Sequence, residues 1–204
     1  SSAVSAQIKV HLKRGRSKPF WVGHPWVFSG AIHKVEGIVG DFGGPCLVLD
    51  ERANVLGAGH YNPHSKIAVR ILEHRRTTDV DFEPQPAIDL IGHRINAAAH
   101  RRTQLGLPSL ETTVYRLVNA EGDLLTGLIV DMIGSVAVMQ TNSRAMYDQR
   151  DALAGHLMGV EGVTAVVGVV TEDTSRIEAV PTGREVLSGD VPDSLRVMEA
   201  GVHY

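Results

Sequence analysis

Residues 13–18 carry the densest positive charge of the chain. In "KRGRSK", four cationic side chains surround a glycine: Lys13, Arg14, Arg16 and Lys18 around Gly15. Lysine and arginine bind phosphate groups as charges without reading base identity, and glycine lets the backbone turn and approach a ligand closely. We therefore predict that these four cations contact the phosphates of an RNA backbone.

Both tryptophans of the chain, Trp21 and Trp26, lie within a few residues of this basic run. In "HPWVFS" (24–29), strand alternation places Trp26 and Phe28 on one face and Val27 on the other. An aromatic ring beside cations could stack on an unpaired base, but large aromatic side chains are more often buried. We expect Trp26 and Phe28 to pack in the core and the basic run to contact RNA.

The stretch "GHYNPHSK" (59–66) places His60 and His64 four residues apart, which on a helix would suggest a metal pair. Pro63 indicates a loop instead, and no third ligand stands nearby, so we predict no metal site. A loop that presents polar side chains to RNA is the favoured functional interpretation: Tyr61, Asn62 and Lys66. Arg70, on the less apolar face of "IAVRILE" (67–73), is a further candidate phosphate contact.

The single cysteine, Cys46, opens an apolar strand, and no base or cation stands within sequence reach to activate it. A buried, inert thiol is favoured, and an independent enzyme with Cys46 as its nucleophile is the weakest alternative. One cysteine excludes an internal disulfide framework and fits a reducing compartment. The sequence has no Gly-x-Gly-x-x-Gly, Gly-x-Ser-x-Gly, Walker or His-Glu-x-x-His motif, so we expect neither catalytic residues nor a cofactor site in this chain.

The charges divide the chain into two regions. Residues 1–75 hold ten Lys and Arg against five Asp and Glu, whereas the remainder holds ten basic and 18 acidic residues. This asymmetry predicts two domains, of which the first offers a positive surface to a polyanion. No apolar run approaches the roughly 18 residues that span a bilayer, so we expect a cytoplasmic protein with no membrane partner.

Short β-rich runs with turn signals between them fill the first region, at 8–12, 30–35, 46–50, 54–62 and 67–73. Five or six such strands predict a compact, closed β-barrel over residues 1–75. Asp50 and Asn54 are suited to bond nearby backbone groups in a tight hairpin. Residues 76–83 are polar and indicate a linker.

We expect a central α+β domain over residues 84–196. Apolar residues three and four apart predict a helix over 86–105, with Pro86 in its first turn and Gly106 as its stop. A second helix, capped by Ser143, is predicted over 143–158. Strands are predicted at 114–119, 127–134, 135–142, 163–170 and 175–182, so that helices cover one side of a small sheet. Residues 197–204 resemble the start of a further strand.

Four stretches occur in an order and spacing that resemble one protein family: "KRGRSKPFWVGHPWVFSGAI", "GAGHYNPHSKIAVRIL", "YRLVNAEGDLLTGLIVDMIG" and "VVTEDTSRIEAV". They resemble the N-terminal half of the S-adenosylmethionine-dependent ribosomal RNA methyltransferases that act on carbon 5 of cytosine in large-subunit RNA. The resemblance implies a PUA domain, which is a small RNA-binding β-barrel, followed by a central α+β domain of strand-strand-helix-strand-strand type. It also implies that the Rossmann-like domain with the cofactor site is absent from this chain.

On this resemblance, the chain would position large-subunit rRNA for a catalytic domain that lies outside it. We therefore expect neither methyl transfer nor S-adenosylmethionine binding from these residues alone. The alternative is a stand-alone RNA-binding or assembly module, which escorts RNA or forms a homodimer without catalysing a reaction. The family usually has Leu-Pro-Gly where this chain has Leu125-Thr126-Gly127.

Overall fold

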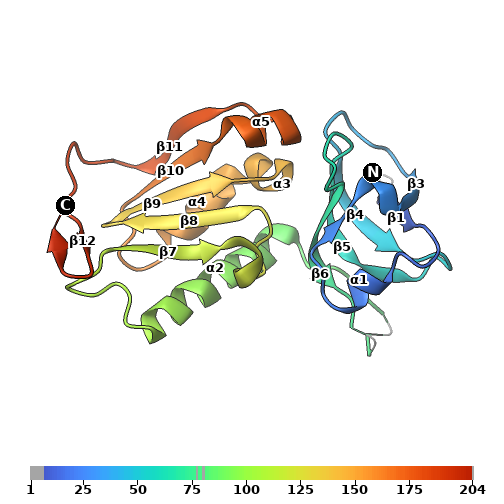
Figure 1. Ribbon diagram of the computed structural model, residues 1–204, viewed down its shortest axis with the longest axis horizontal. Coiled ribbons are helices and arrows are strands. Elements are labelled where there is room, and N and C mark those ends of the chain that lie inside the picture. Colours follow the sequence, from blue (N-terminus) through green and yellow to red (C-terminus); the bar gives the residue numbers. More distant parts are fainter. Residues whose placement is uncertain (1–6, 77, 80, 204) are drawn as a thin grey trace, which may run out of the picture. The chain divides into compact units, whose positions relative to one another are not determined.

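The computed structural model describes residues 7–76, 78–79 and 81–203, which fold into two units (Figure 1). The first unit comprises residues 1–85 with 177–179, and the second comprises 86–176 with 180–204. The predicted linker, 76–83, contains two residues outside the described ones, 77 and 80, and the predicted terminal strand, 197–204, contains one, residue 204. Helices and strands mix along the chain, which confirms the α+β prediction.

Six strands and a short helix build the first unit: β1 (Ile8–Leu12), α1 (Lys18–Trp21), β2 (Trp26–Val27), β3 (Ile32–Glu36), β4 (Gly44–Leu49), β5 (Val55–Tyr61) and β6 (Val69–His74). The strands form one sheet in the order β2-β6-β5-β4-β1-β3, in which only β1 and β4 run parallel. The turn between β4 and β5 is held as expected, because Asp50 Oδ1 accepts the N–H groups of Arg52 and Asn54, each at 2.8 Å.

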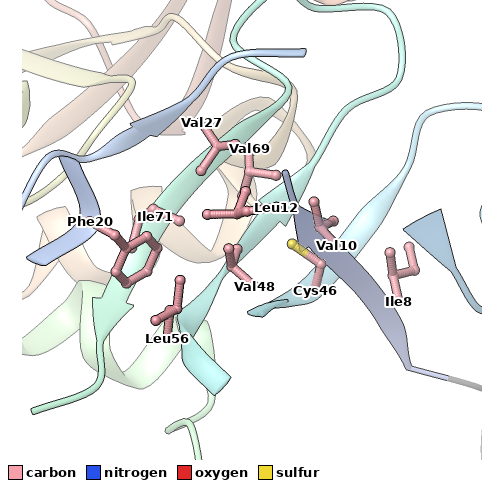
Figure 2. Packing of buried hydrophobic residues seen from close by; sticks show 10 residues of the cluster. All are labelled: Ile8, Val10, Leu12, Phe20, Val27, Cys46, Val48, Leu56, Val69 and Ile71. Atoms are coloured by element: carbon pink, nitrogen blue, oxygen red, sulfur yellow. The ribbon is translucent and has the colours of Figure 1, made fainter. Parts of the chain in front are cut away.

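The core of the first unit forms where buried side chains of α1 and five strands meet (Figure 2). β1 contributes every second residue, Ile8, Val10 and Leu12, as strand alternation requires. Phe20 of α1 joins them, with residues of four further strands: Val27, Cys46, Val48, Leu56, Val69 and Ile71. Each such side chain, fully buried, stabilises the fold by about 1.5–3 kcal/mol, so this cluster holds the sheet curled around itself.

The sheet of the first unit is a half-barrel, because no pairing between described strands joins its edges, β2 and β3. A 3-10 turn, η1 (Ser29–Ala31), spans the interval between these edges. The Ser29 N–H donates to the Lys66 carbonyl and the Lys13 N–H donates to the Ala31 carbonyl, both at 2.9 Å. The predicted closed barrel is therefore confirmed only in part, because a turn with two backbone hydrogen bonds takes the place of a strand ladder.

The second unit begins with a long helix, α2 (Ala87–Gln104), and contains a five-stranded sheet in the order β11-β10-β9-β8-β7. Its strands are β7 (Val114–Asn119), β8 (Leu128–Ile133), β9 (Val136–Thr141), β10 (Ala165–Val170) and β11 (Gly183–Gly189). The intervening helical segments are η2 (Ala120–Asp123), α3 (Arg144–Asp148), α4 (Arg150–Met158) and α5 (Glu172–Glu178). Three predictions are confirmed: the first helix, the hairpin of β8 and β9, and the Ser143 cap, whose hydroxyl accepts the Met146 N–H.

Helices α2 and α4 lie against the same face of this sheet, as Figure 1 shows. The two helices pack closely at Gly92, where an added Cβ would lie 2.4 Å from the ring of His156. Ile91 and Ile95 of α2 are fully buried, as are Leu153 and Leu157 of α4. The apolar periodicity of the sequence therefore identified the faces that form the core.

The strand predicted at 175–182 is wrong, because residues 172–178 form helix α5 and the fifth strand of the sheet is β11. Thr171 directly precedes the helix, and its hydroxyl accepts the Thr174 N–H at 3.3 Å. Two acidic residues in its first turn, Glu172 and Asp173, suit the positive end of a helix dipole. The strand prediction depended on the β-rich composition of this segment. The local signals at its start favour a helix instead.

The C-terminal segment folds as a small hairpin of β12 (Met198–Glu199) and β13 (Val202–His203). The prediction of one continuing strand over 197–204 is wrong for the described residues, because a turn at Ala200 and Gly201, both with positive φ, reverses the chain. Among the helices of the described residues, none has the length and apolar character needed to cross a bilayer.

Candidate nucleic-acid interface

The basic run forms the connection between β1 and α1. Leu12 is buried at the end of β1, and the chain then turns at Gly15, whose φ of +75° favours glycine. Lys18 begins α1, which is anchored in the core by Phe20. Four side chains of this connection are exposed: Lys13, Arg14, Arg16 and Lys18. A buried strand and an anchored helix therefore present all four predicted cations to solvent.

Lys66 joins this surface from the loop between β5 and β6. Its side chain is exposed, and its carbonyl accepts the Ser29 N–H at 2.9 Å. On the other side of η1, Lys13 Nζ donates to the Gly30 carbonyl at 2.8 Å. η1 thus brings Lys13 and Lys66, which are far apart in sequence, against one turn. We name the five cations Lys13, Arg14, Arg16, Lys18 and Lys66 the basic surface.

None of these five side chains forms a salt bridge with a described residue. Lys34 of the same unit differs, because its ammonium group lies against the carboxylate of Glu36. A cation with a carboxylate partner must give up that partner to bind phosphate, whereas a solvated cation releases only water and counterions. The basic surface is therefore available to a polyanion.

Tyr61 and Arg70, the two other predicted RNA contacts, have partners within the first unit. Tyr61 is half-buried against the hydrophobic core, and burial raises the pKa of its hydroxyl. The Arg70 guanidinium donates to a Glu178 carboxylate oxygen at 3.2 Å and lies 5.9 Å from the centroid of the Trp26 ring. Both remain predicted contacts, but neither belongs to the basic surface of exposed cations without salt bridges.

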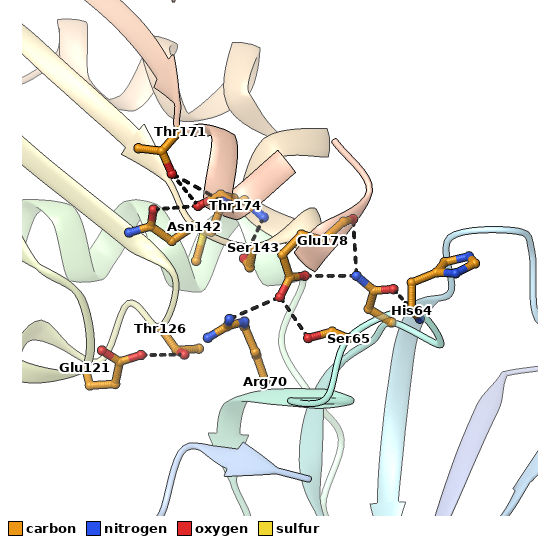
Figure 3. A network of polar contacts seen from close by, with 12 residues as sticks. His64, Ser65, Arg70, Glu121, Thr126, Asn142, Ser143, Thr171, Thr174 and Glu178 are labelled. Atoms are coloured by element: carbon orange, nitrogen blue, oxygen red, sulfur yellow. Dashed lines mark hydrogen bonds and ion pairs between the residues drawn. The ribbon is translucent and has the colours of Figure 1, made fainter. Parts of the chain in front are cut away.

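Glu178 is a residue that sequence reasoning missed (Figure 3). Its carboxylate is buried within the first unit and accepts three side-chain hydrogen bonds, from Arg70, from Ser65 at 3.0 Å and from Asn62 at 2.9 Å. Asn62 was predicted to face RNA, but its side chain is buried, so that prediction is wrong. The Arg-Ile-Glu sequence at 176–178 gave no signal for this, because its partners lie more than a hundred residues away.

The prediction that Phe28 packs in the core is wrong. Its side chain is 49% exposed, whereas the neighbouring Val27 is 6% exposed and belongs to the core. Trp26 is half-buried, and its ring meets that of Phe28 edge to face, with centroids 6.3 Å apart. The predicted alternation is present, but the side chain that faces the core is Val27 and not Phe28. The small Val27 packs there beside Val69.

The surroundings of Cys46, His60 and His64 in the described structure do not indicate catalysis or metal binding by these side chains. Burial raises the pKa of the Cys46 thiol to about 12, and a backbone hydrogen bond at Gly59 opposes this only in part. A thiol with that pKa is protonated at neutral pH and is a poor nucleophile. No group of three or more potential metal ligands occurs among the described residues, and His64 Nε2 lies 2.7 Å from the Asp41 carbonyl.

The first unit, which carries the basic surface, is similar in sequence to a known domain family. Residues 10–74 match the PUA-like domain family. This range contains β1 to β6 almost entirely, together with all five cations of the basic surface. The PUA-like assignment of the first unit is therefore confirmed.

Nearly the whole chain is similar to ribosomal RNA large subunit methyltransferase I of several bacteria. It is 30% identical to the protein of Pseudoalteromonas atlantica over 95% of this chain and 47% of the relative. It is 31% identical to that of Shewanella frigidimarina over 91% of this chain and 45% of the relative. The chain thus spans about half the length of the curated relatives it matches.

Solved structures share the fold at lower sequence identity. A candidate SAM-dependent methyltransferase from Streptococcus mutans is 17% identical and covers 97% of this chain, with a TM-score of 0.74, while the chain covers 48% of it. A candidate methyltransferase complexed with SAH aligns with a TM-score of 0.73 at 16% identity, over 97% of this chain and 47% of that one. The order of half-barrel and α+β unit is therefore shared with methyltransferase-like proteins.

The second unit contains a cavity of about 190 Å³ between its sheet and helices α3 and α4. The Arg150 guanidinium lies 4.4 Å from the centroid of the Tyr147 ring at its edge, and Arg150 Nε lies 3.7 Å from a Glu185 carboxylate oxygen. This volume is below the roughly 300–1,000 Å³ typical of sites for cofactors and drug-sized ligands.

Proposed function

We propose that the first unit binds RNA through the basic surface. The observation that carries this proposal is a set of five exposed cations on a PUA-like unit, none of which forms a salt bridge with a described residue. Cations of this kind neutralise phosphates and release counterions, so binding is favourable, weakly specific and dependent on salt. Tyr61 and Arg70 would add to this surface only at the expense of the contacts they make in the free protein.

We propose further that the chain is the RNA-positioning part of a methyltransferase that modifies large-subunit rRNA. The similarity to ribosomal RNA large subunit methyltransferase I supports this role. The whole enzyme would transfer a methyl group from S-adenosylmethionine to carbon 5 of a cytosine. The residues of this chain would bind and orient the RNA, and the cofactor would be held by a catalytic domain outside the chain.

The basic surface is tested by the salt dependence of RNA binding. Replacing Arg14 and Arg16 by alanine should weaken binding and lower the slope of log K against log salt by about 1.4, since each lost phosphate contact on a single strand accounts for about 0.7. Fluorescence anisotropy with a labelled single-stranded RNA, at several salt concentrations, measures both quantities.

The matched control removes the same charge from the second unit, by the double change Arg176→Ala and Arg184→Ala. Both residues are exposed, and the proposal predicts an unchanged slope for this variant. An equal drop in slope for the two double variants would show that RNA responds to net charge alone, and would contradict the assignment.

The methyltransferase role is tested by the reading frame beyond Tyr204. A continuation into a glycine-rich strand-helix cofactor motif supports the enzyme, and an immediate stop codon supports a stand-alone RNA-binding module. With the full-length protein, isothermal titration with S-adenosylmethionine should show binding. The 204-residue chain should show no binding of S-adenosylmethionine. Tight binding by this chain would contradict the proposal that the cofactor site lies outside it.

A further inference from the structure

Phe28 is a large apolar side chain that is exposed close to two cations of the basic surface. It directly precedes η1, against which Lys13 and Lys66 lie from two sides. Half of its side chain is open to solvent. An exposed phenyl ring beside cations suits a ligand that offers both an apolar face and a negative charge.

The backbone holds Phe28 rigidly in this position. The preceding residue, Val27, is buried in the core. The Phe28 carbonyl accepts the Ala31 N–H at 2.9 Å, and the following residue donates its N–H to the Lys66 carbonyl. A group fixed on both sides loses little conformational entropy when a ligand binds, which favours affinity.

The ring orientation is fixed as well. Trp26 meets Phe28 edge to face, with an interplanar angle of 89°. Trp26 has contacts of its own, because its backbone N–H donates to His24 Nδ1 at 3.2 Å and the Arg70 guanidinium lies over its ring. The supported ring of Phe28 thus retains an exposed surface, whereas Trp26 is enclosed by its neighbours.

We propose that Phe28 is a stacking platform for an unpaired RNA base, with Lys13 and Lys66 binding the flanking phosphates. This inference rests on the proposed RNA-binding function and adds the class of substrate, since only a single-stranded segment can offer a base face to the ring. Trp21 is also exposed, at 56%, but the described structure gives its ring no aromatic neighbour that would fix its orientation.

The test separates base from phosphate contacts. A single-stranded oligoadenosine of about 12 nucleotides is compared with a strand of the same length that lacks bases, and with a duplex of that length. The protein should bind oligoadenosine about tenfold more tightly than the abasic strand, as expected for one stacked base. Phe28→Leu, which keeps an apolar side chain beside Trp26, should remove this preference and leave the salt slope unchanged, while Phe28→Tyr should retain it.

Two control variants complete the design. Phe42→Ala removes another exposed phenylalanine of the same unit, and Trp21→Ala removes the competing ring; neither should change the preference for bases. Unchanged thermal unfolding of Phe28→Leu establishes that the fold is intact. An unchanged preference in Phe28→Leu, or its loss in Trp21→Ala instead, overturns the stacking inference while the salt-dependent binding stands. Absence of binding to all three RNAs overturns the proposed function together with the inference.

Discussion

At the scale of single residues, burial decides which reactive groups can act. Cys46 packs beside Val10 and Val48 in the first core and is 2% exposed. Burial raises its pKa to about 12, so the thiol is protonated at pH 8. A catalytic cysteine needs a depressed pKa and access to substrate, so the structure favours a packing role for Cys46 over the alternative of an independent enzyme.

The reactivity of Cys46 is a direct check on this role. Native protein at pH 8 should react with a thiol reagent such as dithionitrobenzoate only at the rate at which the first unit opens, whereas protein in guanidinium chloride should react within the mixing time. Absorbance at 412 nm, a property of the released reagent, follows the reaction. Rapid labelling of the native protein would contradict a buried thiol and reopen the nucleophile interpretation.

Residue identity alone could not predict the position of Phe28. The two-residue alternation predicted for "HPWVFS" was correct. Alternation alone, however, does not determine which face of the strand packs against the core. The structure resolves the choice through Val69 and Val27, which pair across β2 and β6 and are both buried. The exposure of the cations was predictable because charged side chains stay in water wherever the chain folds, whereas the position of Lys13 and Lys66 at η1 depends on contacts between distant segments.

At the scale of elements, a buried carboxylate joins α2 to η2. Asp123 is 3% exposed, and it accepts hydrogen bonds from Arg101 and Arg102 at 2.7 Å each and from the Asn119 N–H at 2.7 Å. Burial by itself would raise the pKa of Asp123. The hydrogen bonds from Arg101 and Asn119 and the charge of Arg102 outweigh burial, so that its pKa lies below the ordinary value.

Replacing Asp123 by asparagine should therefore destabilise the second unit by about 3 kcal/mol at pH 7, because two arginines lose a buried partner. A carboxyl group with a lowered folded pKa stabilises the fold above its unfolded pKa of about 3.9, and this stability is lost as the pH falls through the folded value. The difference between variant and parent should accordingly shrink below pH 4. Urea unfolding at several pH values measures it.

Asp131→Asn is the matched control for this prediction. Asp131 pairs with Arg116 in an ion pair whose side chains are 40% and 47% exposed, and exposed pairs contribute less than about 1 kcal/mol. Equal losses of stability for the two variants would contradict a special role for the buried carboxylate.

Elements with strong local signals were predictable from the sequence, and those determined by distant contacts were not. Helix α2 and the hairpin of β8 and β9 follow from apolar periodicity and a Gly-Ser turn. Helix α5 carried a cap at Thr171 that outweighs its β-rich composition. Strand β11 was not predicted, because its exposed edge residues show no apolar alternation and it is placed by pairing with β10.

At the scale of the whole molecule, the charge asymmetry corresponds to the division of the chain into two units. Residues 1–75 carry the positive excess and contain the range that matches the PUA-like domain family, whereas the acidic excess lies in the remainder of the chain. A polyanion such as RNA is attracted to the first and repelled by the second. This distribution supports the proposed RNA binding by the first unit.

The central claim is that RNA meets this chain at the basic surface around η1. Photo-crosslinking of a single-stranded RNA containing 4-thiouridine, followed by mass spectrometry of the crosslinked peptides, tests it most directly. We predict crosslinks in peptides that contain residues 13–18, 28–31 and 66, and their loss when Arg14 and Arg16 are replaced by alanine. Crosslinks confined to residues 86–203, unaffected by that replacement, would contradict the claim.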